Sequence, residues 1–229
     1  MAENTINRYL DHAVLKPELT RQEAADAIKL GIKYKVRTVC VRPCDIEMAS
    51  ELCKGTETQV SCVLAFPHGD TLSEVKAVEA RLYIEKGTNE IDMVANYGYI
   101  RSGLWDLVEK DIKAVSMVTK PAGILLKVIL EANTLNTEEI AKATVIAIKA
   151  GADYVKTSTG FNGPGATVEA VEAMVKAAEG RIKVKASGGI RNYEQAKRFV
   201  DMGCDRLGNG YGSTPAICDG NGEESKEAY

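Results

Sequence analysis

The strongest constraint on the fold of this chain is a repeated alternation of short β-branched runs with helical stretches. Between the runs, apolar residues recur at helical spacing, for example at Leu72, Val75, Val78 and Leu82. Strands that alternate with helices form a parallel sheet, and eight such units in one domain are typical of a closed (β/α)8 barrel. The expected strands lie at residues 9–12 (the weakest), 37–41, 59–65, 89–95, 124–130, 153–157, 182–186 and 205–208.

A recurring layout supports the barrel. The segments 87–92, 151–156 and 203–208 each begin with a glycine that ends a helix, followed by a short turn and a strand. The same strand position therefore carries Asp92, Lys156 and Gly208. A doubly wound open sheet is the alternative, but no G-x-G-x-x-G follows the first strand, which disfavours that fold.

The last residues differ in composition from the rest of the chain. The segment 213–229 is rich in Gly, Asp, Asn, Glu and Ser and shows little periodicity. We therefore expect one domain, a (β/α)8 barrel over residues 1–212, followed by a flexible C-terminal tail over residues 213–229.

Charge and apolar content exclude several classes of protein. The chain of 229 residues carries 29 Lys and Arg against 32 Asp and Glu, a net charge of −3, so it lacks the broad basic surface that nucleic-acid binding needs. The most apolar stretch, 123–130, is short and contains Lys127, which argues against a membrane span. The six cysteines form no C-x-x-C motif, and residues 1–10 are polar. We expect a soluble, cytoplasmic protein without nucleic-acid or membrane partners.

The most informative side chains are charges inside apolar strands. Asp92, Lys127, Lys156 and Lys185 each interrupt a run of apolar residues, on four consecutive strands. Burying an unpaired charge costs several kcal/mol or shifts its protonation. Neighbouring strands lie about 4.8 Å apart, so the four side chains can converge in one polar pocket. A structural ion-pair network is the alternative for any one of them, but four together favour a functional site.

Three amines beside one carboxylate suit carbonyl chemistry. An amine attacks a carbonyl only after losing its proton, and an ordinary lysine is almost fully protonated at neutral pH. Burial and two neighbouring ammonium groups both favour the neutral form of the third amine. The resulting imine stabilises an adjacent carbanion, as an aldol cleavage or condensation requires. Asp92 is then the group that moves a proton to or from the substrate hydroxyl.

Glycine-rich loops follow the last three strands. They comprise residues 156–160, 187–191 and 208–210. Any single loop of this kind is more often a simple turn. Together, beside the lysines and after strands six to eight of a barrel, they indicate a phosphate site built from backbone amides.

With these motifs the sequence resembles deoxyribose-phosphate aldolase, a class I aldolase family with a (β/α)8 barrel. The resemblance covers nearly the whole chain and is carried by Asp11-His12, E-I-D-M-V at 90–94, L-K-V-I at 126–129, V-K-T-S-T-G-F at 155–161 and V-K-A-S-G-G-I-R at 184–191. It implies reversible cleavage of 2-deoxy-D-ribose 5-phosphate to acetaldehyde and D-glyceraldehyde 3-phosphate. It also implies small aldehydes and sugar phosphates as partners, no cofactor and, by analogy, a homodimer.

The resemblance implies a role for individual residues. Lys156 is implied as the Schiff-base lysine, Lys185 as the neighbour that perturbs it, and Asp92 as the proton-transfer residue. Asp11 and Lys127 are implied as supporting polar groups, and the terminal Tyr229 as a proton shuttle. The expected substrate- and phosphate-binding residues are Cys40, Thr159, Gly160, Gly188, Gly189, Asn209 and Gly210.

Three alternatives stay open. The family usually shows a G-T-S run after strand eight, where this chain has G-N-G-Y-G at 208–212, so a Schiff-base aldolase with a relaxed phosphate requirement is one. A Schiff-base aldolase with another substrate and a non-catalytic sugar-phosphate-binding barrel are the others. A metal-dependent aldolase needs a histidine cluster, whereas this chain has only His12 and His68, and His68 replaces a usually apolar residue. We therefore expect no metal site.

Overall fold

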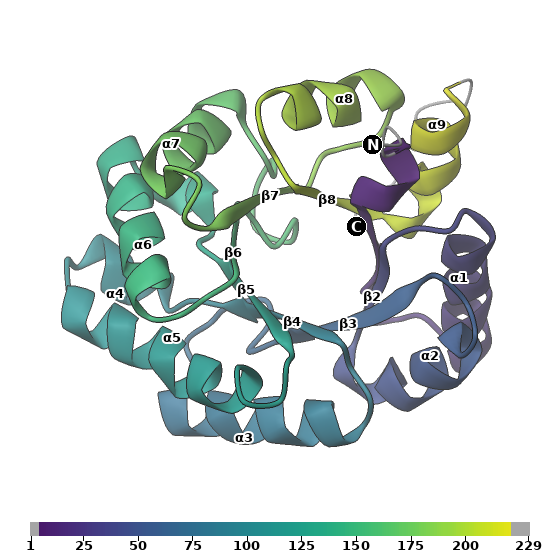
Figure 1. Cartoon of the computed structure of the whole chain (residues 1–229), viewed down its shortest axis with the longest axis horizontal. Coiled ribbons are helices and arrows are strands. Elements are labelled where there is room, and N and C mark those ends of the chain that lie inside the picture. Colours follow the sequence, from purple (N-terminus) through teal and green to yellow (C-terminus); the bar gives the residue numbers. More distant parts are fainter. Residues whose placement is uncertain (1–4, 221–229) are drawn as a thin grey trace.

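A computed structural model describes residues 5–220 of the chain. Eight parallel strands follow one another around a closed barrel, and helices surround it (Figure 1). β8 pairs with β1, for example at Asp11 and Gly208, and this pairing closes the ring. The expected (β/α)8 fold is confirmed. The strands are β1 (Leu10–Val14), β2 (Thr38–Val41), β3 (Gln59–Leu64), β4 (Glu90–Val94), β5 (Leu125–Ile129), β6 (Tyr154–Lys156), β7 (Lys183–Ser187) and β8 (Arg206–Gly210).

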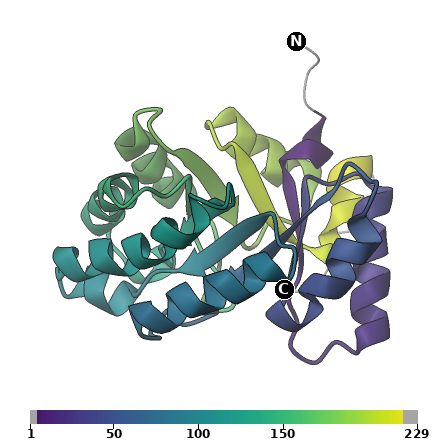
Figure 2. The same cartoon turned by 60° about the horizontal axis from the view of Figure 1, so that its bottom comes forward.

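The helices form an outer layer around the tilted strands (Figure 2). None of the helices within the described part of the chain is long and apolar enough to cross a membrane. The α-helices are α1 (Arg21–Lys33), α2 (Ile46–Cys53), α3 (Ser73–Glu85), α4 (Tyr97–Arg101), α5 (Trp105–Thr119), α6 (Thr137–Lys149), α7 (Val168–Ala178), α8 (Tyr193–Asp201) and α9 (Thr214–Asp219). Short 3-10 turns are η1 (Ile6–Tyr9), η2 (Pro43–Asp45), η3 (Ala132–Thr134) and η4 (Tyr211–Ser213).

Side-chain caps start several of these helices. Thr20 and Glu23 form a capping box at the start of α1, and Asn136 and Glu139 form another at the start of α6. Each box satisfies two backbone N–H groups that have no partner within the helix. These caps fix where α1 and α6 leave the loops that follow β1 and β5.

The apolar core lies between the barrel and the helices. Val39, Ile91 and Val128 are fully buried on the outer face of their strands, where they pack in the main hydrophobic cluster. Side chains alternate between the two faces of a strand, so Asp92 and Lys127 point into the barrel instead. Most apolar strand residues thus stabilise the outside of the barrel, and the inside holds the charged groups together with a small apolar cluster.

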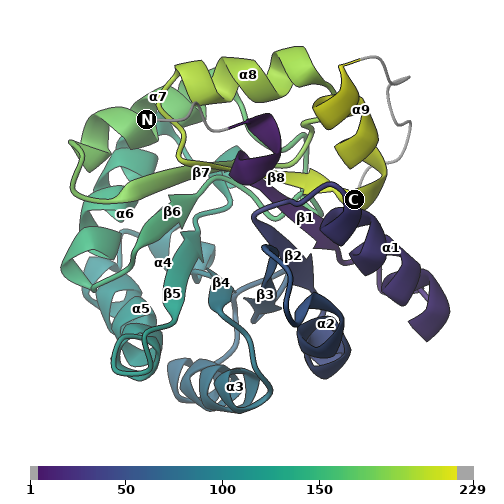
Figure 3. The same cartoon turned by 45° about the vertical axis from the view of Figure 1, so that its right-hand side comes forward.

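The expectation of a flexible tail from residue 213 is wrong for its first residues. Residues 214–219 form α9, in which Thr214 and Ile217 are buried, and Gly220 follows in the left-handed conformation. α9 lies between α8 and α1, where it fills the last place in the helical layer (Figure 3). The polar composition of the tail comes mainly from residues 220–229, which concealed this short helix. Residues 221–229, including Tyr229, lie outside the described part of the chain.

Candidate active site

A cluster of ionisable side chains fills the centre of the barrel. Its members come from six strands, point inward and are at most 3% exposed. Burial of so many charges is tolerable only if they pair with one another. The cluster consists of Asp11, Glu90, Asp92, Lys127, Lys156, Lys185 and Arg206.

Asp92 is the centre of the cluster. Its Oδ1 accepts a hydrogen bond from Lys127 Nζ at 2.7 Å. Its Oδ2 accepts from Lys156 Nζ at 2.9 Å and from Lys185 Nζ at 2.7 Å. The three lysines that interrupt apolar strands in the sequence therefore all contact the fourth such charge, the carboxylate of Asp92.

Asp11, Glu90 and Arg206 support these groups from the N-terminal side. Arg206 donates to Asp11 Oδ1 at 2.5 Å and to Glu90 Oε1 at 3.0 Å. Lys185 Nζ lies 2.5 Å from Asp11 Oδ2, and Lys127 Nζ lies 2.6 Å from Glu90 Oε2. Sequence reasoning missed roles for Glu90 and Arg206. Their signal was spacing: Glu90 lies two residues before Asp92, on the same face of β4.

Electrostatics keep the central carboxylate ionised. Burial by itself raises the pKa of Asp92, but the charges of Lys127, Lys156 and Lys185 outweigh it and hold that pKa well below the usual value. For Lys127 the balance is reversed: burial lowers its pKa, but the carboxylates of Asp92, Glu90 and Asp11 raise it well above the usual value. Lys127 is thus a fixed ammonium group of the site.

The three lysines differ in how strongly carboxylates hold them. Lys127 lies within 3.5 Å of oxygens from three carboxylates, and Lys185 contacts two. Among the carboxylates of residues 5–220, Lys156 contacts Asp92 alone. Lys156 is also the last residue of β6, at the C-terminal end of the barrel where barrel enzymes bind their substrates. It is the amine of this cluster that is least committed to ion pairs.

A small apolar wall faces the lysines. It consists of Ala13, Leu15, Cys40 and Val63, with Phe66 packed against them, and it is separate from the main core. Burial raises the pKa of the Cys40 thiol, and the charge of Asp92 adds to the effect. Cys40 therefore stays a neutral thiol. The sequence had suggested that Cys40 lies near the pocket, and the structure has it in this apolar wall.

The glycine loops lie at the C-terminal ends of β6 to β8. Gly188 and Gly189 have φ values of 87° and 75°, which other residues rarely adopt. A Cβ atom at Gly188 would come within 2.8 Å of the backbone of Gly165 and within 3.3 Å of Gly160. The loops after β6 and β7 therefore pack directly on each other. Gly210, at the end of β8, is half-buried beside them.

Two side chains of the expected phosphate-binding set are engaged elsewhere. Asn209 points out of the barrel, where its Nδ2 donates to Thr214 Oγ1 at 2.8 Å and to the carbonyl of Gly210. Thr159 Oγ1 donates to Glu131 Oε2 at 2.5 Å. These two side chains are thus already hydrogen-bonded within the protein.

Glu131 is a buried acid that sequence reasoning missed. It lies two residues after the end of β5 and is 0% exposed, with φ 55° and ψ 58°. Burial raises its pKa, while hydrogen bonds from Thr159 and the charges of Lys156 and His68 oppose the rise. The sequence did contain a signal for Glu131, because an acidic residue near the carboxyl end of a barrel strand is a candidate site residue.

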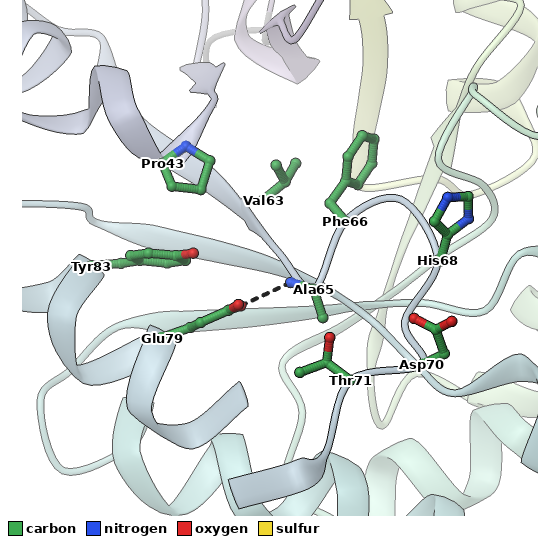
Figure 4. Close-up of a pocket in the computed structure, with 9 residues that line it drawn as sticks. All are labelled: Pro43, Val63, Ala65, Phe66, His68, Asp70, Thr71, Glu79 and Tyr83. Atoms are coloured by element: carbon green, nitrogen blue, oxygen red, sulfur yellow. Dashed lines mark hydrogen bonds between the residues drawn. The ribbon is translucent and has the colours of Figure 1, made fainter. Parts of the chain in front are cut away.

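A cavity of about 290 Å³ opens beneath the loop that follows β3 (Figure 4), and none of the cluster side chains lines it. Val63 lines the cavity and is the sheet neighbour of Asp92. Phe66 and His68 project from the loop, and Glu79 of α3 accepts a hydrogen bond from the Ala65 N–H at 3.0 Å. His68 is exposed. Over residues 5–220, no group of three or more His, Cys, Asp and Glu side chains is arranged to hold a metal ion.

Comparisons with known proteins agree in sequence and in structure. The model of the DeoC/LacD family aldolases matches residues 5–218. A deoxyribose-phosphate aldolase of Streptococcus sanguinis is 44% identical over 224 residues, which cover 98% of this chain and 99% of that protein.

Two solved structures extend the likeness to the whole barrel. The aldolase QR15 has a TM-score of 0.88 at 38% identity, covering 94% of this chain and 95% of its own. A deoxyribose phosphate aldolase of Aeropyrum pernix, which has a tetrameric structure, has a TM-score of 0.85 at 28% identity, covering 93% of this chain and 89% of its own.

Proposed function

Because this chain belongs to the DeoC/LacD aldolase family, we propose that it cleaves 2-deoxy-D-ribose 5-phosphate reversibly to acetaldehyde and D-glyceraldehyde 3-phosphate through a Schiff base on Lys156. The substrate is taken from the name of relatives such as the Streptococcus sanguinis protein. The observation that carries the mechanism is the position of Lys156, buried at the C-terminal end of β6 with its Nζ 2.9 Å from Asp92.

The ion balance of the cluster supports Lys156 as the nucleophile. Four basic and three acidic side chains share the barrel interior, so one positive charge is in excess when all are ionised. Loss of a proton from one amine restores the balance. Lys156 has the fewest ion pairs of the three lysines, because in the described part of the chain Asp92 is its one carboxylate contact, so freeing its amine breaks the least ion pairing. Its free amine can then attack the substrate carbonyl.

In the proposed reaction, Lys156 adds to the C1 carbonyl, and loss of water gives the iminium ion. A base removes the proton of the C3 hydroxyl while the C2–C3 bond breaks and its electrons pass to the iminium. D-glyceraldehyde 3-phosphate leaves, and the remaining enamine takes a proton at carbon and is hydrolysed to acetaldehyde. We assign the transfer of these protons to Asp92, directly or through a water, because its carboxylate is ionised and lies 2.9 Å from Lys156 Nζ.

We assign the phosphate to the backbone of Gly189 and Gly210, with Gly160 on the opposite loop; the N–H of Gly188, which the sequence had included, donates to the Gly208 carbonyl at 3.2 Å instead. The engagement of Asn209 and Thr159 elsewhere favours the alternative of a relaxed phosphate requirement. Steady-state kinetics with deoxyribose and with its 5-phosphate separate the two. A large loss of kcat/KM without the phosphate supports the phosphate site, and similar values support the relaxed requirement.

The compartment and the assembly belong to the same proposal. All six cysteines are unpaired, which suits the reducing cytoplasm. Leu72, Val75, Val78 and Leu82 of the α3 region are exposed and would be covered in a homodimer. Small aldehydes and sugar phosphates are the proposed partners of the site.

Borohydride trapping with acetaldehyde, followed by peptide mapping, tests the mechanism. We expect a reduced N-ethyl adduct on Lys156 in the unaltered protein and none in Lys156→Leu, which should remain folded. Lys183→Leu is a matched control, because Lys183 is exposed at the opposite end of β7. An adduct on another lysine moves the nucleophile there. Complete absence of an adduct in folded protein makes the sugar-phosphate-binding barrel the better proposal.

A further inference from the structure

Both carboxylate oxygens of Glu131 accept hydrogen bonds from one residue, Thr159. Its Oε1 accepts the backbone N–H of Thr159 at 3.3 Å, and its Oε2 accepts the Thr159 hydroxyl at 2.5 Å. Thr159 lies three residues after Lys156, in the turn that leaves β6. The two contacts therefore fasten this turn to the end of β5.

The contact continues from Thr159 to Phe161. Thr159 Oγ1 accepts the backbone N–H of Phe161 at 3.1 Å. The Phe161 ring meets the Phe66 ring edge-on, with 5.1 Å between centroids and 83° between planes. Phe66 follows β3 and Phe161 follows β6, so the aromatic pair spans the C-terminal opening of the barrel. Phe66 also packs on the apolar wall that contains Cys40.

The position of Glu131 is costly without a role. A fully buried carboxyl group must be compensated by hydrogen bonds. A left-handed backbone costs a residue other than glycine about 1 kcal/mol or more. The proposed reaction assigns no step to Glu131, and in the described part of the chain no basic side chain forms an ion pair with it. The hydrogen bonds of its carboxylate both go to the turn after β6.

We propose that Glu131 is a positioning residue that acts through Thr159 to hold Phe161 against Phe66, and so closes the mouth of the barrel over Lys156. This inference rests on the proposed function. A closed aromatic cover excludes water from the imine and enamine and holds the bound substrate in place. Glu131 does not touch the reacting atoms; its effect reaches them through the position of the loop.

Hydrogen exchange tests the clamp without reference to activity. Glu131→Gln replaces one of the two acceptor oxygens that hold Thr159, and Thr159→Val removes both the hydroxyl bound to Glu131 and the acceptor of the Phe161 N–H. Because either change loosens the turn, the amides of Thr159 and Phe161 should exchange at least about tenfold faster in both variants. Thr159→Ser, which keeps the hydroxyl group, should keep the protection. Glu138→Gln is the matched control, since Glu138 is an exposed acid seven residues further on. Exchange that is unchanged in both Glu131→Gln and Thr159→Val overturns the proposal.

Kinetics test what the clamp does. We expect Glu131→Gln to raise KM for deoxyribose 5-phosphate about tenfold, while kcat and the rate of imine trapping at saturating acetaldehyde change less than about twofold. Phe161→Ala should raise KM equally. The double variant Glu131→Gln/Phe161→Ala should be no worse than Phe161→Ala alone, because both changes act on one contact.

Three other results overturn the inference. Additive effects in the double variant mean that Glu131 does not act through Phe161. A trapping rate that falls as far as kcat/KM means that Glu131 acts on Lys156 itself. An unchanged KM means that the clamp does not govern substrate binding. If the unaltered protein forms no imine but exchange still accelerates in Glu131→Gln, the proposed function fails and the clamp stands.

Discussion

At the scale of single residues, the three lysines of the site share Asp92 but are not equivalent. Lys127 is locked among three carboxylates, whereas Lys185 bridges Asp11 and Asp92. Lys185 and Lys156 bind the same oxygen of Asp92 and therefore compete for it. This competition weakens the hold of Asp92 on Lys156. Lys185 thus acts on the proposed nucleophile through a shared partner as well as through direct repulsion.

Replacing Lys185 with Leu should consequently slow imine formation. Without Lys185, Asp92 Oδ2 interacts with Lys156 alone and holds its amine more tightly. We expect the rate of borohydride trapping near neutral pH to fall about tenfold or more, and the rate to recover at higher pH. The measurement is the trapping rate against pH, with Lys183→Leu as control. Equal trapping by Lys185→Leu and the unaltered protein near pH 7 would contradict this account.

A second residue, His12, couples the fold to pH. His12 is fully buried on the outer face of β1, with Nε2 2.9 Å from the Ala27 carbonyl and Nδ1 2.7 Å from Thr214 Oγ1. Burial lowers the pKa of His12 to about 4 from an ordinary 6.5. The neutral ring can donate to the Ala27 carbonyl and accept from the Thr214 hydroxyl. A protonated ring would have to donate to Thr214 Oγ1, which already accepts a hydrogen bond from Asn209.

Stability should therefore fall as the pH is lowered from about 6.5 to about 5. In that window the unfolded chain binds a proton at His12 and the folded chain does not, so unfolding becomes more favourable by about 2 kcal/mol. Above pH 6.5 the ring is neutral in both states and the effect disappears. Urea unfolding across this range should give a shallower pH dependence for His12→Gln. Parallel curves for both proteins would exclude His12 as the cause.

At the scale of elements, one buried ion pair joins α3 to α5, to the loop after β3 and to the end of β4. Lys76 of α3 is fully buried and lies 2.7 Å from Asp111 of α5. Its Nζ also donates to the carbonyls of Gly69 at 2.7 Å and Val94 at 3.0 Å. Gly69 lies in the loop that carries Phe66, and Val94 ends the strand that carries Asp92. The pair therefore fixes the relation between that loop and β4.

Lys76→Met should destabilise the protein by about 3 kcal/mol or more, because it leaves Asp111 buried without its counter-ion. The double variant Lys76→Met/Asp111→Asn should recover part of the loss, since the remaining charge is removed as well. Free energies of unfolding in urea measure both effects. Equal loss in the single and double variants would mean that the methylene packing of Lys76, and not its charge, stabilises these elements.

The elements also separate what a sequence can predict from what it cannot. Lys127, Lys156 and Lys185 could be found because a charge inside an apolar strand has few explanations other than a site. Glu90 and Arg206 escaped because they begin their strands, where charged residues often meet solvent. The resemblance to an aldolase family was confirmed by the comparisons, while the roles of individual residues stay predictions.

Helical spacing predicted α3 but not its orientation. Leu72, Val75, Val78 and Leu82 have the periodicity of a buried stripe, yet each is more than two-fifths exposed, and Lys76 and Ala80 face the barrel instead. A charged lysine on the barrel-facing side is favourable only because Lys76 Nζ contacts Asp111 and the carbonyls of Gly69 and Val94. These partners lie on other elements of the fold. Tertiary partners of this kind leave no local pattern.

At the scale of the whole molecule, polar and apolar layers are inverted relative to a simple globule. The centre of the barrel holds charges, the main apolar core forms a shell between strands and helices, and part of the outer surface is apolar again. The exposed apolar side chains gather on α3 and on its neighbour α5, which contributes Leu107 at 41% exposure. An exposed apolar face of two packed helices is characteristic of a surface that associates with a copy of itself.

We therefore expect the chain to self-associate through α3, as the proposed homodimer requires. Val78→Lys/Leu82→Lys should convert the assembly to monomers, because two charges per copy would face each other across a twofold interface. Both side chains are exposed in the single chain, at 45% and 48%, so the barrel itself should keep its free energy of unfolding within about 0.5 kcal/mol. Val145→Lys is the matched control, since Val145 is 43% exposed on α6, away from α3. Light scattering coupled to size exclusion measures the mass of each protein. If the unaltered chain is a monomer, there is no such interface. If the assembly survives in the double variant, the interface lies elsewhere. A monomeric variant that is still trapped on Lys156 would show that each barrel carries a complete site.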